Sequence, residues 1–445
     1  MKIEARKESV KILRKIDVEG SFSHLTLNDA LSNPELSDMD RRFIMSIVYG
    51  VLENKLLLDY YIRKLSTLRF GKINHEIVII LRMGLYQLIF MDRVPDSAAV
   101  NESVKLAKKI GNRYGGFVNG ILRAFIRMQK TIELPDRKRH LSTHLSILYS
   151  HPEWLVEKWL KAYGATFTEA LLSANNSVPE LWVRVNTLKT DSDTLIKDLA
   201  EEGVDSHSAT ILPDALQIKA SHSQRIETLK AYKSGLFSVQ DISSMSVGAI
   251  SGVQPGDFVI DVCAAPGGKS THMAQLMSNK GRILARDISP QKIGLIQENS
   301  ERLGIDILEV QVFDAMKYDD TLTGTADVVL VDAPCSGFGI IRRKPDIKYN
   351  KSEADLQALT EIQFKILETA SEYVKPGGVL IYSTCTINDE ENGAIVHEFL
   401  RHHPQYVLTP VSGVPGVTEE GTVQLFPNVH ASDGFFIAKM TRRNN

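Results

Sequence analysis

The sequence predicts a multidomain protein with an all-α first part, a small α+β connecting part and a C-terminal α/β part. The length of 445 residues exceeds that of a typical single domain and suggests about two or three. Apolar residues recur with helical spacing through residues 1–140. Over residues 235–445, short apolar runs alternate with helical segments, which is typical of a parallel sheet covered by helices. Residues 141–234 show a mixed pattern and form the connecting part.

The composition is that of an ordinary globular protein, with 43% hydrophobic and 24% charged residues. The segment Met1 to Lys7 alternates charged and apolar residues and does not resemble a signal peptide. The longest apolar stretch, residues 77–91, is interrupted by Arg82 and Gln87. It is shorter than the roughly 18 residues that a membrane span needs, so it predicts a buried helix. We therefore expect a cytoplasmic protein without a membrane partner.

Helix start signals support the all-α first part. Ser37 to Asp40 has the spacing of a capping box, with Asp in place of Glu, and precedes an apolar-periodic stretch over residues 41–58. This pattern predicts one helix over that stretch. Asp96 and Ser97 are predicted to cap a second helix over residues 98–110.

The charge is distributed unevenly along the chain. The formal net charge is −2, but residues 1–140 hold 25 basic and 16 acidic residues, whereas the remainder holds 27 and 38. A basic first part can contact nucleic-acid phosphates without reading sequence. Ordinary solvated helix faces are the alternative, and it stays open here. The basic clusters are Lys11, Arg14 and Lys15; Lys105, Lys108 and Lys109; and Arg137, Lys138 and Arg139.

The connecting part carries two local signals. Ser150, His151 and Pro152 predict the start of a helix, with proline near its first position. Residues 181–186 alternate as a strand does. Arg184 and Asn186 fall on one face of that strand, where they face either RNA or solvent.

Five apolar runs in the last part predict strands of one parallel sheet. They cover residues 258–262, 282–285, 308–312, 327–331 and 379–383. Ligands of such sheets bind at the carboxyl ends of the strands, so the residues that follow each run are the candidates for a site.

A turn rich in small residues follows the first run. It contains Cys263, Ala264, Ala265, Pro266, Gly267, Gly268 and Lys269. Small residues let a ligand approach the backbone, and the start of the next helix can hold a carboxylate. Gly268, Lys269 and Ser270 match the end of a Walker A loop, but that motif needs glycine where this chain has Cys263. A nucleotide triphosphatase is therefore disfavoured.

Two acidic residues follow the next two runs. Asp287 lies about 20 residues beyond the turn, as expected of a residue that accepts hydrogen bonds from ribose hydroxyls. Asp314 is placed to accept one from an adenine amino group. Ribose, adenine and an amino-acid tail together fit S-adenosylmethionine as the cofactor.

The three cysteines, Cys263, Cys335 and Cys385, all follow predicted strands. None belongs to a CxxC pair, which argues against a zinc site. His140 and His144 lack the glutamate of an HExxH motif. We therefore expect no metal, and we interpret the cysteines as chemical groups near the cofactor. For Cys263, the alternative of a small apolar core residue stays open.

Longer motifs connect the chain to known families. "LRMGLYQLIFMDRVPDSAAVNESVKLAKK" and "GGFVNGILR" resemble the NusB-like helical RNA-binding domain over roughly residues 1–130. "DAPCSG" from Asp332 and "STCT" from Ser383 resemble the RNA cytosine-C5 methyltransferases, and nearly the whole chain resembles the bacterial 16S ribosomal RNA enzymes of the RsmB (Sun, Fmu) type. "IIRRKPDIK" and "DGFFIAK" also look like family sequence, and Lys292 departs from an expected arginine.

The resemblance implies a fold, a reaction and site residues. It implies a NusB-like first domain and a Rossmann-like, S-adenosylmethionine-dependent methyltransferase domain at the C-terminus. Cys385 would be the nucleophile and Cys335 would assist release, while Asp332 would contact both cofactor and base. The turn from Cys263 to Lys269, together with Asp287, Asp314 and Asp332, would contact the cofactor.

The chemistry explains why such residues are needed. A thiolate added at C6 makes C5 of cytosine nucleophilic, so the protein must supply a thiolate, which a nearby cation such as Lys269 would favour. The target base must be single-stranded or flipped out. We expect RNA, and most specifically 16S ribosomal RNA, as the partner, and no obligate protein partner.

Two other functions stay open from the sequence. A DNA cytosine methyltransferase would use Cys335 as nucleophile, which leaves the Thr384–Cys385 pair unexplained. A non-catalytic RNA-binding or antitermination protein would explain residues 1–130 but not the cysteines and acidic residues at the ends of the predicted strands.

Overall fold

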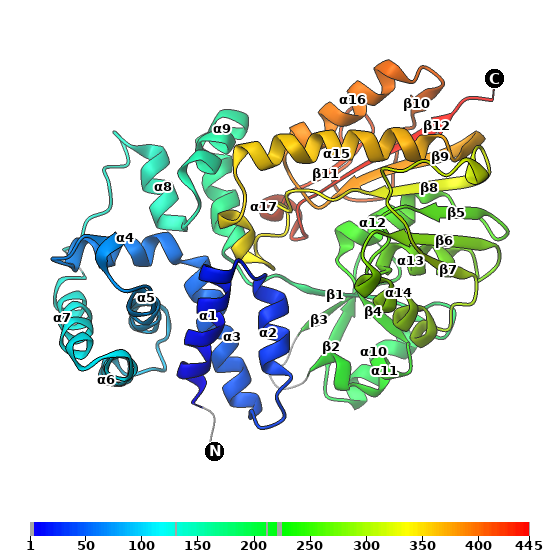
Figure 1. The fold of residues 1–445 in the computed structure, drawn as a ribbon. Coiled ribbons are helices and arrows are strands. Elements are labelled where there is room, and N and C mark those ends of the chain that lie inside the picture. The colour runs from blue at the N-terminus through cyan, green and yellow to red at the C-terminus, as the bar shows by residue number, and fades with distance from the viewer. Residues whose placement is uncertain (1–3, 130, 211, 220–224, 445) are drawn as a thin grey trace. The chain divides into compact units, whose positions relative to one another are not determined.

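The computed structural model describes residues 4–129, 131–210, 212–219 and 225–444, so Met1 to Ile3 of the N-terminal segment lie outside the described residues. The chain divides into two compact units. The helical unit comprises residues 1–177 together with residues 341–350, and the mixed unit comprises residues 178–340 and 351–445. Figure 1 shows the elements of both.

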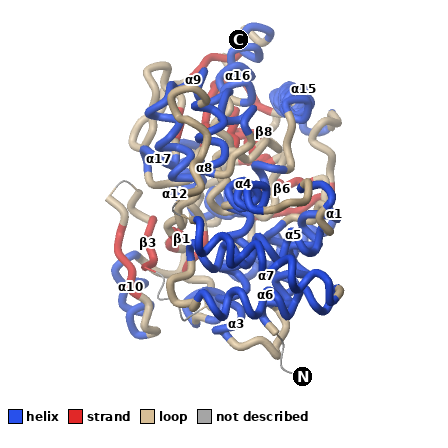
Figure 2. Tube along the Cα trace, turned by 90° about the vertical axis from the view of Figure 1, so that its left-hand side faces the viewer, coloured by secondary structure: helices blue, strands red, loops and turns tan. Residues whose placement is uncertain are grey.

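The described residues of the helical unit form helices and no strands, which confirms the prediction for the first part of the chain. Its helices are α1 (Ala5–Glu19), α2 (Ser23–Leu31), α3 (Asp38–Glu53), α4 (Lys55–Leu65), η1 (Phe70–Lys72), α5 (His75–Phe90), α6 (Asp96–Ile110), α7 (Asn112–Met128), α8 (Leu141–Tyr149), α9 (Glu153–Asn175) and η4 (Pro345–Tyr349). Helix α5 covers the long apolar stretch and is buried along most of its length, as predicted. Figure 2 shows these helices in blue.

Two predictions about helix ends are wrong. The stretch 41–58 is divided between α3 and α4 at Asn54, whose φ of −109° and ψ of 17° leave the helical region. The Asn54 side chain donates to the carbonyl of Gly50 at 2.9 Å and so competes with the backbone ladder. Helix α6 begins at Asp96 after Pro95, so Asp96 lies in the first turn and does not cap it. The cap at Ser37 is confirmed, because its Oγ accepts from the amide of Asp40 at 3.1 Å.

Residues 341–350 pack into the helical unit although the segments before and after them in the sequence belong to the mixed unit. Lys348 is fully buried and its Nζ donates to the carbonyl of Glu53 at 3.0 Å and to Oδ1 of Asn176 at 3.1 Å. The Tyr349 hydroxyl donates to the carbonyls of Leu52 and Ser150 at 3.0 and 2.9 Å. This segment therefore completes the polar contacts of the helical unit.

The mixed unit begins with a four-stranded antiparallel sheet in the order β2-β3-β1-β4. Its strands and helices are β1 (Leu181–Val185), α10 (Ser192–Glu201), β2 (Asp205–Ser208), β3 (Ala215–Lys219), η2 (Ile226–Thr228), α11 (Lys230–Lys233) and β4 (Phe237–Val239). The predicted strand over residues 181–186 is confirmed as β1.

Both interpretations of Arg184 and Asn186 are wrong, because their exposed fractions are 1% and 2%. Arg184 donates to the carbonyl of Gly268 at 2.8 Å and to Oγ1 of Thr271 at 3.1 Å. Burial lowers the pKa of Arg184 to about 9. Alternation places a side chain on one face of a strand but does not reveal what covers that face. Here the small sheet packs against the start of a helix in the same unit.

The second sheet of the mixed unit runs in the order β10-β12-β9-β8-β5-β6-β7, with β11 paired to β12. Its strands are β5 (Phe258–Asp261), β6 (Arg282–Asp287), β7 (Leu308–Val312), β8 (Ala326–Asp332), β9 (Val374–Thr384), β10 (Tyr406–Leu408), β11 (Val423–Leu425) and β12 (Phe435–Arg442). Strands β5 to β9 are parallel, which confirms the predicted sheet, whereas β12 and its neighbours are antiparallel additions. The remaining helices are α12 (Ile242–Ser251), α13 (Gly268–Leu276), α14 (Pro290–Leu303), η3 (Asp320–Leu322), α15 (Glu353–Ser371), η5 (Asp389–Glu391), α16 (Gly393–His402) and α17 (Pro427–His430).

Helices cover both faces of this sheet. Along β8, Val329 and Val331 pack with α15 and α16, whereas Val328 and Leu330 pack with α12 and α13. The alternation follows from the two-residue period of a strand. A strand buried on both faces shows a continuous apolar run, which explains why the sequence revealed these strands. Among the described residues, no helix is long and apolar enough to cross a membrane.

Candidate functional site

The order of the sheet places the candidate site between β5 and β8. The chain proceeds from β5 to β6 and β7 on one side, then returns to β8 and β9 on the other. The loops that follow β5 and β8 therefore diverge and leave a crevice at the carboxyl ends of the strands. All the residues predicted for the site, except Cys263 to Lys269 in the turn after β5, follow or end β6, β7, β8 and β9.

The turn after β5 is held in a conformation that glycine permits. Gly267 has a φ of 95°, and helix α13 begins at the next residue. A side chain with a Cβ would be strained in this left-handed region. The amides of the first turn of α13 have no partners within the helix, so they can receive a carboxylate. Lys269 lies in this turn.

Asp261, at the end of β5, supports the small-residue turn and was not among the predicted residues. It is fully buried, and its Oδ2 accepts from the Ser270 hydroxyl at 2.6 Å. Burial raises the pKa of Asp261 to about 7. The signal was its position directly before the small-residue turn, but an acid at a strand end commonly has only a local role.

Asp287 and Asp314 present oriented carboxylates at the next two strand ends. The two oxygens of Asp287 accept from the amides of Ala265 at 3.3 Å and Ser289 at 2.9 Å. Oδ1 of Asp314 accepts from the amide of Met316 at 3.1 Å. Each carboxylate retains acceptor positions for hydroxyl or amino donors. Ile288, directly after Asp287, is 63% exposed and was not among the predicted residues.

Lys269 links the turn after β5 to β8. Its Nζ lies 2.5 Å from Oδ2 of Asp332, while the Ser383 hydroxyl donates to Oδ1 of Asp332 at 2.9 Å. Burial alone would lower the pKa of Lys269, but the carboxylate of Asp332 outweighs it and raises the pKa. Lys269 therefore remains a cation, and it also interacts electrostatically with Cys385.

Cys335 and Cys385 lie side by side at the ends of β8 and β9. Their Sγ atoms are 3.3 Å apart, and both residues are partly exposed. The hydrogen bond with Cys385, burial and the charge of Glu391 raise the pKa of the Cys335 thiol well above its ordinary value. Two thiols at this distance can act on the same small molecule.

Cys263 has a different environment. Its side chain packs against the core cluster beneath the sheet. Burial and the negative charges of Asp261, Asp332 and Asp287 raise the pKa of its thiol well above the ordinary value. Cys263 therefore remains a neutral thiol, which fits a residue that packs beside the turn.

Close backbone contacts hold the loop of Cys335 against β9. The amide of Gly339 donates to the carbonyl of Cys385 at 3.0 Å, and the amide of Gly434 donates to the carbonyl of Gly339 at 2.8 Å. A Cβ at Gly339 would collide with the carbonyl of Gly434. Glycine is required at position 339 because three backbone segments meet there.

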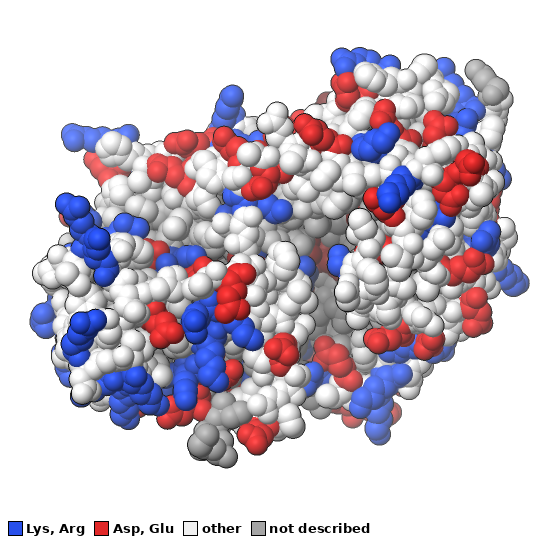
Figure 3. All heavy atoms as spheres, in the orientation of Figure 1, with Lys and Arg blue, Asp and Glu red and all other residues white. Residues whose placement is uncertain are grey.

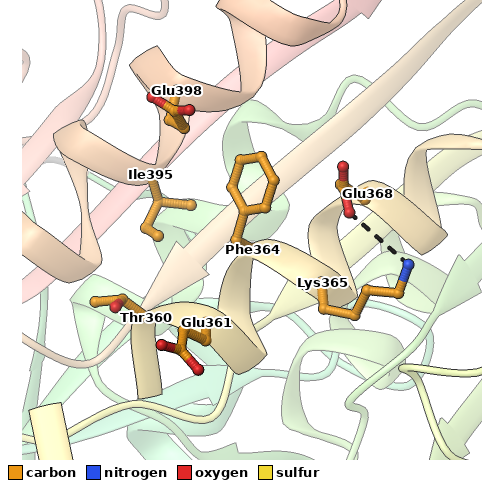
Figure 4. Close-up of a pocket in the computed structure, with 7 residues that line it drawn as sticks. All are labelled: Thr360, Glu361, Phe364, Lys365, Glu368, Ile395 and Glu398. Carbon is orange, nitrogen blue, oxygen red and sulfur yellow. Dashed lines mark ion pairs between the residues drawn. The ribbon is translucent and has the colours of Figure 1, made fainter. Parts of the chain in front are cut away.

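Other surface features do not join this site. A depression between α15 and α16 has an apolar floor of Phe364 and Ile395, and its rim carries Lys365 and Glu368, 3.8 Å apart (Figure 4). It contains none of the predicted site residues. Within the described ranges, no group of three or more His, Cys, Asp or Glu side chains is arranged to hold a metal ion.

Several basic residues of the predicted clusters form ion pairs with acidic side chains. Lys105 and Lys109 lie 2.6 Å from Glu102 and 2.7 Å from Glu4, and Lys11 lies 2.8 Å from Glu8. Figure 3 shows basic and acidic side chains intermingled over the helical unit. The local field of these clusters is therefore weaker than the basic residues alone suggest.

Family comparisons match the three parts of the chain. The model "16S rRNA methyltransferase RsmB/F" matches residues 250–441, the "NusB family" matches residues 3–127, and the "Methyltr_RsmF/B-like, ferredoxin-like domain" matches residues 151–224. These matches agree with the resemblance expected from the sequence.

Similar proteins cover the whole chain. "Probable ribosomal RNA small subunit methyltransferase B" of Bacillus subtilis (strain 168) is 36% identical, covering 99% of each chain. "Ribosomal RNA small subunit methyltransferase B" of Cronobacter sakazakii (strain ATCC BAA-894) is 32% identical, covering 92% of each.

Solved structures share the fold. The crystal structure of PH0851 has a TM-score of 0.82 and 28% identity, covering 99% of each chain. NSun6 from Pyrococcus horikoshii with SFG has a TM-score of 0.60 and 25% identity, covering 66% of this chain and 98% of that one. With the site geometry, these findings show that the chain belongs to the RsmB/F family of S-adenosylmethionine-dependent 16S ribosomal RNA methyltransferases.

Proposed function

We propose that this chain methylates C5 of a cytosine in 16S ribosomal RNA through a covalent bond between Cys385 and C6 of the base. The observation that carries the proposal is the 3.3 Å separation of the Cys335 and Cys385 Sγ atoms at neighbouring strand ends. One thiol can attack the base while the other remains close enough to act on the adduct.

The residues around β5 to β7 fit the cofactor. Asp287 would accept from the ribose hydroxyls and Asp314 from the adenine amino group, while the exposed side chain of Ile288 would contact the adenine ring. The backbone from Cys263 to Lys269 would hold the amino-acid tail, which the start of α13 favours. Bound S-adenosylmethionine supplies an electrophilic methyl group.

Cys385 would begin the reaction. Its thiolate adds to C6, and electrons move towards N3, so that C5 becomes nucleophilic. Lys269 stabilises the thiolate before attack, and the Asp332 carboxylate is placed to orient the base. A base that reaches these groups must leave its stack or come from a single strand.

Cys335 would act in the last step, which releases the methylated base. After C5 is methylated, a base removes the C5 proton, the C5–C6 double bond re-forms, and the bond from C6 to Cys385 breaks. Cys335 is close enough to Cys385 to pass its own thiol proton to the departing Cys385 sulfur and, as the resulting thiolate, to take the C5 proton in exchange. Its raised pKa makes that thiolate a stronger base than an ordinary cysteine.

We also propose a division of labour along the chain. Residues 1–140 would bind RNA, residues 141–234 would form a connecting RNA-binding domain, and residues 235–445 would carry catalysis. No obligate protein partner is required by this proposal.

The experiment that tests the function offers labelled S-adenosylmethionine with 16S ribosomal RNA and with cytosine-containing DNA. We expect label in RNA, recovered as 5-methylcytosine after digestion to nucleosides. Label in DNA, or in another nucleoside of RNA, would contradict the proposal.

A further inference from the structure

Glu391 is a buried carboxylate at the end of η5 that the proposed chemistry does not use. It is 0% exposed. Its Oε2 accepts from the Ser336 amide at 2.8 Å and from Nε2 of Gln363 at 2.9 Å. Its Oε1 accepts from the Ser336 hydroxyl at 2.6 Å and from Nδ2 of Asn388 at 3.1 Å. Four donors thus converge on one anion.

These donors come from the segments that carry the two cysteines. Ser336 directly follows Cys335, and its hydroxyl lies 2.8 Å from Oγ1 of Thr386, which directly follows Cys385. Gln363 also donates to the carbonyl of Pro334 at 2.9 Å, so both neighbours of Cys335 are held. Glu391 therefore connects β8, β9 and α15 immediately behind the thiols.

We propose that Glu391 is a positioning residue that holds Cys335 beside Cys385 and keeps the two cysteines in different roles. The positioning follows from the hydrogen bonds alone, while the assignment of Cys335 to the release step rests on the proposed function. Removing the carboxylate would free the segment Pro334 to Ser336 from its main anchor.

The negative charge of Glu391 also acts on Cys335. After the hydrogen bond with Cys385 and burial, it contributes to the raised pKa of Cys335. Tyr382 within β9 also interacts with Cys335 and Glu391, while the cation of Lys269 interacts with Cys385. The negative charge of Glu391 therefore favours the neutral thiol of Cys335 before release begins.

The first test measures thiol reactivity and does not depend on catalysis. Iodoacetamide labelling of Cys335 is followed by mass spectrometry across a pH series, in the parent protein and in Glu391→Gln. We expect the midpoint pH for Cys335 to fall by about one unit in the variant, the size typical of a neighbouring charge. Glu390→Gln, which removes a charge from the exposed neighbouring residue of η5, is expected to leave the midpoint unchanged. An unchanged midpoint in a folded Glu391→Gln protein would overturn the electrostatic part of the proposal.

The second test measures the lifetime of the protein–RNA adduct with cofactor present. We expect Glu391→Gln to lengthen it about 10- to 100-fold, because small misplacements of a catalytic group cost that much. Glu391→Asp retains the charge but withdraws the carboxylate, so it should lengthen the lifetime while keeping the parent midpoint for Cys335.

The two readouts separate the possible failures. A lower melting temperature with unchanged adduct lifetime in both variants would show a merely structural role and overturn the positioning. If the parent protein forms no adduct, the proposed function fails, and the labelling midpoints still decide whether Glu391 controls Cys335. If Glu391→Gln does not fold, Glu391→Asp supplies the decisive lifetime.

Discussion

The two units of the chain handle buried charge in opposite ways. In the helical unit, Arg82 donates to both oxygens of Asp59 at 2.7 and 2.8 Å and lies 2.5 Å from Asp17, and all three side chains are about 10% exposed or less. In the mixed unit, Asp332 pairs with Lys269 but keeps 28% of its side chain exposed. A closed network has no capacity left for a ligand, whereas the open pair retains acceptor positions. The comparison predicts that chemistry depends on the mixed unit and that the helical unit changes only affinity.

The largest effect should come from the cysteines. Cys385→Ala is expected to lower methylation at least about 10³-fold and to form no adduct, because the attack on C6 is lost. In Cys335→Ala, Cys385 should still attack the base and C5 should still be methylated, but the RNA should be released slowly. A denaturing gel with RNA and S-adenosylmethionine should therefore show a stable protein–RNA band for Cys335→Ala alone. A band in Cys385→Ala and none in Cys335→Ala would assign the nucleophile to the other strand, as in the DNA-type reaction.

Breaking the open ion pair should have the next largest effect. Asp332→Asn leaves Lys269 partly buried without its counter-charge, so we expect about 10²-fold lower activity and a lower melting temperature. The double variant Asp332→Asn with Lys269→Met should regain most of the melting temperature but none of the rate. Recovery of both would mean that the pair serves stability only, as the Arg82 network does.

The variant Asp287→Ala tests the proposed binding of S-adenosylmethionine by the mixed unit. Asp287→Ala should weaken S-adenosylmethionine binding by about 1.5 to 3 kcal/mol, the range for hydrogen bonds to a charged group. Isothermal titration calorimetry measures this directly. Asp320→Ala, at an exposed carboxylate of the same unit, is the matched control. Affinity within twofold of the parent in Asp287→Ala would remove the ribose role.

The smallest effect is expected from the helical unit. Lys105, Lys108 and Lys109 line a hollow with Arg6, so replacing the three lysines with glutamine should reduce the slope of log K against log salt by about 2 on the single-strand relation. The rate at saturating RNA should not change. Replacing Arg137, Lys138 and Arg139 is the comparison, because these three basic residues do not line the hollow. An equal slope in the parent and the first variant would exclude that hollow as an RNA contact.

The sequence predicted the parts of the fold that depend on local pattern. The strands β5, β6, β8 and β9 each contain a continuous apolar run, and the positions of the cysteines and acidic residues at the strand ends follow from the strand order. It failed where distant segments decide the outcome. Arg184 alternates like an outward-facing residue, yet the start of α13 covers it. Glu391 ends a run of three acids that suggests a solvated turn, but the donors that bury it come from Ser336 and Gln363. The break at Asn54 was hidden because apolar periodicity continues through it.

The segment 341–350 has a consequence for how the chain is made. The ribosome synthesises α1 to α9 before this segment. The carbonyls of Glu53, Leu52 and Ser150 therefore have no hydrogen bond from Lys348 or Tyr349 until the segment has been made. Strand β8 emerges before the segment and β9 after it. The helical unit is therefore completed between the synthesis of β8 and that of β9, the strands that precede Cys335 and Cys385. A fragment that ends at residue 140 or 177 would reproduce an intermediate of synthesis rather than the finished unit.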